Sequence, residues 1–135
     1  MPRSARTWQV SAAQVRAYVR KAQEFADAAA SELDAERHIA ATSLAIHAAI
    51  NAADAVCGAR VGRRAAGESH DQVVSLLTTA GTDGNAVAKD LRRFLPLKTQ
   101  AEYEPEDIAH GVAAKAVERA LRCVSVAQAV AASLN

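Results

Sequence analysis

Apolar residues recur at three- and four-residue intervals along most of this chain, which is the period of an amphipathic α-helix. After Ser11, for example, Val15, Tyr18 and Val19 begin an apolar stripe that continues to about Leu33. Such stripes predict an all-α, up-and-down bundle of three long and two short helices. The expected helices cover residues 11–33, 35–59, 69–80, 86–95 and 105–130.

Local signals predict where these helices begin. Ser11 and Gln14 have the spacing of a capping box, in which each side chain pairs with a backbone N–H at the helix start. Ser69 and Gln72 repeat that spacing at the third helix. Asp34 is a good cap for the second helix, because its carboxylate can accept from the first backbone N–H groups.

Glycine and proline predict where the helices end. The Gly- and Arg-rich segment 60–69 has no apolar period and is expected to be a loop. Residues 82–85 (TDGN) have the composition of a turn, and Pro96 is expected to end the fourth helix. Residues 97–104 then connect to the last helix, whose first turn accommodates Pro105.

Composition and charge narrow the class of protein. The 135 residues make one domain, which we place at 11–135 behind a flexible N-terminal arm over residues 1–10. Alanine is roughly a quarter of the chain, which favours helices over a sandwich or barrel. Aromatic residues are only 4%. The net charge of +1 excludes a strongly basic tail for nucleic acid but leaves room for a local basic patch.

The same features predict where the protein works. No apolar run approaches the ~18 residues that span a bilayer. The N-terminal residues MPRSARTWQV lack the apolar core of a secretory signal. Cys57 and Cys123 lie in apolar helical patterns and are expected to be buried, reduced thiols. We therefore expect a soluble cytoplasmic protein without membrane contact.

Metal and cofactor chemistry is not indicated. The chain has four histidines, and no two of them have i, i+4 spacing on one expected helix. The cysteines have no CxxC arrangement, and no glycine-rich phosphate loop follows a strand. The sequence predicts neither a metal site nor a cofactor.

A polar stripe along the second helix has two interpretations. Ser43, His47, Asn51 and Asp54 lie beside the apolar face at helical spacing. They form either a half-exposed surface next to the core or the wall of a pocket. In a pocket, Asp54 would set the charge or tautomer of a nearby His or Arg.

Basic residues gather in two short segments, the first of them just before His70. Brought together by the bundle, they would form a basic patch of the size of a phosphate group. Left apart, they are solvated surface residues. Aromatic partners for stacking bases are scarce nearby, which argues against single-strand binding. The basic residues are Arg60, Arg63, Arg64, Arg92, Arg93 and Lys98.

Two motifs resemble the HEPN superfamily. The stretch SLAIHAAINAADAVCGARVGRRAAGESHDQVVSLL (43–77) is similar to the family's second helix, loop and third helix, with the pair His70 and Asp71 opening the latter. The stretch LPLKTQAEYEP (95–105) resembles the block before the family's last helix, with Lys98 in the place of an arginine and Tyr103 at its end. The resemblance covers about residues 11 to 130.

The resemblance implies a small helical bundle that is commonly a homodimer. Many HEPN proteins are metal-independent ribonucleases of toxin–antitoxin and defence systems, often partnered by a nucleotidyltransferase-type antitoxin. Their signature is Arg, four to six residues, then His, paired across the dimer cleft. The arginine would hold the scissile phosphate, and the histidine would shuttle the proton of an attacking 2′-hydroxyl. Other members lack the signature and bind a partner.

This chain departs from the signature before its last helix, where Lys98 and Tyr103 stand in its place. We therefore expect a non-catalytic HEPN-like domain that dimerises and binds a protein partner, a nucleotide or RNA. The alternative is a ribonuclease that uses Arg64 with His70, or Arg63 with His70. A third hypothesis is a structural bundle with no ligand. The expected binding residues are Arg60, Arg63, Lys98, Tyr103, His47, Asn51 and Asp54.

Overall fold

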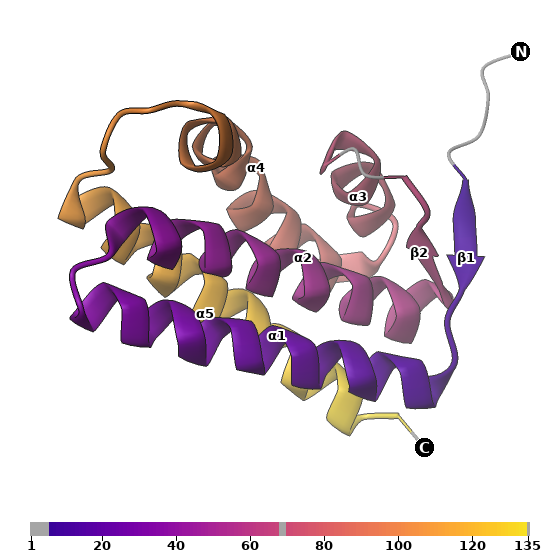
Figure 1. The fold of residues 1–135 in the computed structure, drawn as a ribbon. Helices are drawn as coiled ribbons and strands as arrows, with labels where there is room; N and C mark the ends of the chain where they lie inside the picture. The colour runs from indigo at the N-terminus through magenta and orange to yellow at the C-terminus, as the bar shows by residue number, and fades with distance from the viewer. Residues whose placement is uncertain (1–5, 68–69, 135) are drawn as a thin grey trace, which may run out of the picture.

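The computed structural model describes residues 6–67 and 70–134. These residues form five α-helices and a two-stranded antiparallel ribbon (Figure 1), which confirms the predicted all-α helical bundle. Four of the helices are long and one is short, instead of three and two. The elements are β1 (Thr7–Gln9), α1 (Ala12–Asp34), α2 (His38–Val61), β2 (Arg63–Ala65), α3 (His70–Leu77), α4 (Gly81–Tyr103) and α5 (His110–Ala132).

The start of α1 follows the prediction, whereas the start of α2 does not. The Ser11 Oγ accepts from the backbone N–H of Gln14 at 3.1 Å, and the Gln14 Oε1 accepts from the backbone N–H of Ser11 at 2.9 Å, which confirms the capping box. Asp34, expected to cap α2, is instead the last residue of α1. The N-cap of α2 is Arg37, which makes no side-chain cap bond. The chain reverses at Glu36, whose φ of 61° is left-handed.

The central helix is α2, which packs against α1, α5, α4 and α3. Small residues on nearly every face of α2 are fully buried, so the surrounding helices approach closely. Cys57 of α2 and Cys123 of α5 are both buried and make no disulfide, as predicted for their positions. Burial raises the pKa of each thiol to about 12, so both are held as inert thiols.

The burial of α2 also explains its apolar character. Among the residues described by the structure, it is the one helix long and apolar enough to cross a membrane by length and composition. The sequence prediction looked for an uninterrupted apolar run long enough to span a bilayer and found none. Helix α2 instead meets a criterion on mean hydropathy, which allows polar residues within the helix. The other helices bury 61% of its most apolar window, as they do for the core helix of a bundle.

The two strands were not predicted. β1 lies in the segment expected to be an arm, and β2 lies in the segment expected to be a loop. They pair antiparallel, with Trp8 opposite Arg64. Gly62, with a left-handed φ of 71°, ends α2 and turns the chain into β2. The capping box predicted at Ser69 and the residues before Arg6 lie outside the described part of the chain.

The prediction for α4 was wrong at three points. The helix begins at Gly81, so residues 82–85 are helical and not a turn, and it continues through Pro96 to Tyr103, so 97–104 is not a connection. Burial of large side chains such as Leu91 and Phe94, both 0% exposed, outweighs the local breakers. In Figure 1 the last part of α4 is turned relative to its first part, as expected at a proline within a helix.

The start of α5 also differs from the prediction. Pro105 lies in the connection between α4 and α5 and not in the first turn of the last helix, which begins at His110. Ile108, only 2% exposed, anchors this connection to the bundle. The late start of α5 has a physical reason: Ile108 is buried against the bundle while it is still part of the connection, before the helix begins at His110.

Candidate functional site

A pocket of about 320 Å³ lies between α2, β2, α3 and α4. Four residues singled out from the sequence line it: Asp54, Arg64, His70 and Lys98. Ile50 and Val73 supply apolar walls. The fold thus brings to one pocket a residue of the polar stripe (Asp54), two of the six basic residues (Arg64 and Lys98) and the histidine that follows the loop (His70).

Arg64 reaches the pocket from β2 and is held in place by two contacts. Its Nη1 donates to the carbonyl oxygen of Ala65 at 3.2 Å. Its guanidinium carbon lies 5.9 Å from the centre of the Tyr18 ring of α1, a cation–π distance. Tyr18 carries no signal for this role in the sequence, because it belongs to the apolar stripe of its helix and lies far from Arg64 along the chain.

Lys98 enters from the part of α4 that follows Pro96. In the described residues, neither Lys98 nor Arg64 forms an ion pair, whereas Arg60 binds Asp83 and Arg122 binds Asp90, each at 2.8 Å. Within the described part of the chain, two cations therefore form no ion pair at the same pocket. This arrangement favours an anionic ligand.

His70 is the least satisfied polar side chain of the site. It is 7% exposed, and both of its ring nitrogens are buried without a hydrogen-bond partner in the part of the chain that the structure describes. Burial lowers its pKa, and the nearby positive charge of Lys98 lowers it further. The ring is therefore neutral at neutral pH. A buried imidazole without a partner costs stability, which a ligand that hydrogen-bonds to it would restore.

Asp54 completes the charged groups of the pocket. Burial raises its pKa from 3.8 to about 6, against the opposing influence of the positive charges of Arg64 and Lys21. Lys21, on α1, had no signal in the sequence because it lies on the polar face of an amphipathic helix. The carboxyl group consequently changes its charge close to neutral pH.

The rest of the polar stripe does not line this pocket. His47 is exposed and stacks on Phe25, with ring centres 5.4 Å apart. Asn51 donates to the backbone oxygen of His47 at 2.8 Å. Ser43 lines a different pocket. The stripe therefore lines a pocket at Asp54 and a different one at Ser43, and it is at least partly exposed surface at His47 and Asn51.

Most of the other basic residues and Tyr103 lie elsewhere. Arg60 is paired with Asp83, and Arg63 donates to the Thr7 Oγ1 at 3.4 Å. Arg63 and Arg64 are neighbours on one strand, so their side chains leave it on opposite faces. Tyr103 is 75% exposed at the last residue of α4. The remaining two, Arg92 and Arg93, are both exposed on α4.

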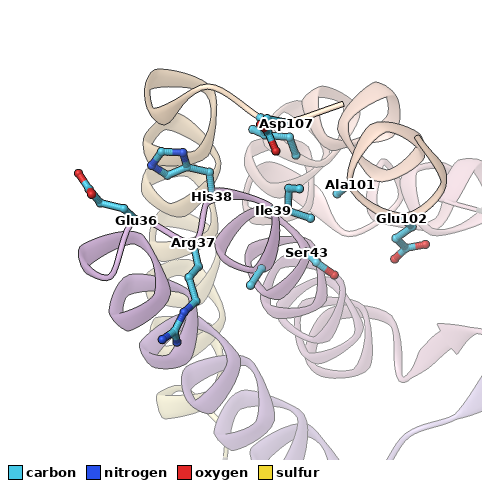
Figure 2. A pocket seen from close by; sticks show the side chains of 10 residues that line it. Glu36, Arg37, His38, Ile39, Ser43, Ala101, Glu102 and Asp107 are labelled. Carbon is cyan, nitrogen blue, oxygen red and sulfur yellow. The ribbon is translucent and has the colours of Figure 1, made fainter. Parts of the chain in front are cut away.

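A larger pocket, of about 790 Å³, lies where the α1–α2 turn meets the end of α4 and the connection to α5 (Figure 2). Its charged groups are mainly carboxylates, and Figure 2 shows those of Glu36 and Glu102 on opposite sides of it. His38 lines it, and its Nε2 lies 3.3 Å from the Nδ1 of His110. Among the described residues, no group of three or more His, Cys, Asp or Glu side chains is placed to hold a metal ion.

The two stretches singled out in the sequence, residues 43–77 and 95–105, each contribute to the lining of the smaller pocket. The first runs along α2, β2 and α3, and the second lies on α4 around Lys98. In comparisons with known proteins, no protein-family model and no curated protein matches this chain.

Proposed function

We propose that this chain is a non-catalytic, HEPN-like helical domain whose smaller pocket binds the phosphate group of a nucleotide or an RNA. The observation that carries the proposal is the meeting at one pocket of Arg64, Lys98 and His70, none of which has an ion-pair or hydrogen-bond partner from another side chain among residues 6–67 and 70–134. A phosphate group offers oxygens to both cations, and it reaches the buried nitrogens of His70 only after the pocket opens. The homodimer and the protein partner that the resemblance implies are part of the same proposal.

The chemistry of the two cations suits a phosphate. The planar guanidinium of Arg64 donates in a fork that matches two phosphate oxygens, and the Lys98 ammonium adds a point charge from another helix. Because the net charge of the chain is only +1, a polyanion gains little attraction from the molecule as a whole. Binding therefore depends on these few groups.

The environment of His70 argues for binding without catalysis. A general base must come within hydrogen-bond reach of the proton that it removes. Both ring nitrogens of His70 are buried, so an attacking hydroxyl group reaches them only after the pocket opens. Tyr103, which stands where the family has its histidine, is 75% exposed and does not line this pocket.

Calorimetric titration with inorganic phosphate and with a short oligoadenylate tests the proposal. We expect Arg64→Gln and Lys98→Gln each to weaken both ligands about 10-fold or more, because each removes a charged hydrogen bond. Arg63→Gln is the matched control for Arg64, since it removes the neighbouring charge on the opposite face of β2. Lys89→Gln, at an exposed position of α4, is the control for Lys98. Equal losses in a variant and its control would contradict the proposed site.

The alternative function is a metal-independent ribonuclease. One observation favours it: Arg64 and His70, which have the spacing of the family signature, line the same pocket. In this mechanism Arg64 holds the scissile phosphate and His70 accepts the proton of the 2′-hydroxyl. Of the two candidate arginines, Arg63 is directed toward Thr7 and is the weaker one.

Incubation of the purified chain with RNA in the presence of a chelator distinguishes the two functions. The binding function predicts intact RNA. Cleavage that is lost in His70→Ala and in Arg64→Gln, and kept in Arg63→Gln, would establish the ribonuclease instead.

A further inference from the structure

The ribbon of β1 and β2 pairs an aromatic residue with a residue that lines the smaller pocket. Trp8 of β1 is directly opposite Arg64 of β2 in the antiparallel register. Side chains of directly opposed residues project from the same face of the ribbon, with Cβ atoms about 5 Å apart. Arg64 lines the pocket, so the register places Trp8 next to one of the lining residues, while Trp8 itself is not one of them.

The backbone around Trp8 is fixed, although its ring is not buried. The Val10 N–H donates to the Gly62 oxygen at 2.9 Å, and the Ala66 N–H donates to the Arg6 oxygen at 2.9 Å. Val10 also packs so closely on α2 that a Cβ placed at Gly58 would lie 2.6 Å from the Val10 Cγ1. The indole itself remains 52% exposed. The backbone that carries the ring is therefore fixed, and Trp8 keeps exposed surface for another group within the described part of the protein.

Two aromatic residues on other elements neighbour Arg64, one by a ring contact and the other by strand register. Tyr18 lies on one side of its guanidinium, and Trp8 is its neighbour across the ribbon. Aromatic rings and guanidinium planes are the groups on which proteins stack nucleobases. A base and its 5′-phosphate are joined by a single sugar ring, so a phosphate held at Arg64 leaves its base within reach of a side chain one strand away.

We propose that Trp8 is the stacking platform for the nucleobase of the ligand whose phosphate the pocket holds. This inference rests on the proposed function and narrows its ligand to a nucleoside 5′-phosphate, either free or as part of single-stranded RNA. A phosphorylated sugar without a base would use the pocket but not Trp8. The base adds affinity that the phosphate contacts alone do not provide.

Trp8 is the single tryptophan of the chain, so fluorescence of the intact protein excited at wavelengths beyond tyrosine absorption reports on this residue alone. We expect adenosine 5′-monophosphate to quench that fluorescence on binding, and ribose 5-phosphate and inorganic phosphate to bind without quenching. By calorimetry, the nucleotide should bind about 10-fold more tightly than ribose 5-phosphate, the gain typical of one stacked base. A short oligoadenylate that binds more tightly still identifies RNA as the source, and equal binding identifies the free nucleotide.

Variants separate stacking from a merely structural role of the strand. Trp8→Leu should weaken the nucleotide about 10-fold and leave ribose 5-phosphate unchanged, and Trp8→Phe should retain most of the nucleotide affinity. Tyr103→Leu, at another exposed aromatic position, is the matched control and should change neither.

Two outcomes would overturn the inference while the proposed function stands: equal binding of nucleotide and ribose 5-phosphate, or equal weakening of both by Trp8→Leu. Binding of none of these phosphates would remove the proposed function, and the role of Trp8 with it.

Discussion

The charge of Asp54 is set by opposing influences on a single carboxyl group. Burial disfavours its ionised form and raises its pKa to about 6, whereas Arg64 and Lys21 favour that form and keep the pKa from rising further. The folded state therefore holds the Asp54 proton more tightly than the unfolded chain, whose reference pKa is 3.8. The stabilisation by the neutral carboxyl is complete below about pH 3.8 and is lost as pH rises through about 6.

Asp54→Asn tests this balance, because the amide stays neutral at every pH. A pKa difference of about two units corresponds to at most ~3 kcal/mol. We expect the variant to have a higher Tm than the wild type at about pH 8 and a smaller or no advantage at about pH 4. Thermal denaturation at both pH values measures this difference. An advantage of the same size at both would show that ionisation of Asp54 is not its source.

At the scale of single residues, the sequence predicted part of the site. Arg64 and His70 were found by their spacing, and Lys98 by its place in a motif. Tyr18 and Trp8 were missed, because an aromatic residue in an apolar stripe or a short strand gives no local sign of a neighbour some 50 residues away. Contacts between distant segments depend on the packing of the whole bundle, which no single spacing reveals.

Among the elements, α1 was predicted well and α4 was not. The capping box at Ser11 is a local interaction, so the sequence shows it directly. The breakers of α4, TDGN and Pro96, are local signals too, but the helix is continued by side chains such as Phe94 that bury themselves against other elements. The pairing of β1 with β2 is equally non-local. Tertiary packing overrode local propensity in each case.

The proline within α4 also bears on the candidate site, because Pro96 lies two residues before Lys98. Proline in a helix interior removes one backbone hydrogen bond and forces a bend. Since Pro96 is exposed, Pro96→Ala loses little packing, and we expect it to stabilise the protein by about 1 to 2 kcal/mol. The same change straightens α4 and moves Lys98, so phosphate binding should weaken several-fold.

Chemical denaturation and calorimetry on the same variant measure the two effects. Thr99→Ala, at an exposed position of the same helix, is the control and should leave phosphate binding unchanged. Stabilisation without loss of binding would show that the bend does not position Lys98.

At the scale of the whole molecule, where the charged residues lie matters more for binding than how many of each sign there are. The chain has 16 basic and 15 acidic residues, and several arginines outside the pocket are neutralised in ion pairs, such as Arg60 with Asp83 and Arg122 with Asp90. The bundle leaves Arg64 and Lys98 unpaired at one site in the described residues. This distribution supports our proposal that the pocket binds a phosphate locally, and it gives the protein little general attraction for a polyanion.

The salt dependence of oligoadenylate binding distinguishes local binding at the pocket from a general attraction of the surface for a polyanion. Each phosphate neutralised on a single strand contributes about −0.7 to the slope of log K against log salt, so two cations predict a slope of about −1.4 and a loss of about 7-fold in affinity between 50 and 200 mM salt. Arg64→Gln should reduce the slope by about 0.7, and Arg63→Gln should leave it unchanged. A slope steeper than about −3 would mean that exposed arginines such as Arg92 and Arg93 also bind the strand, and that the surface rather than the pocket carries the interaction.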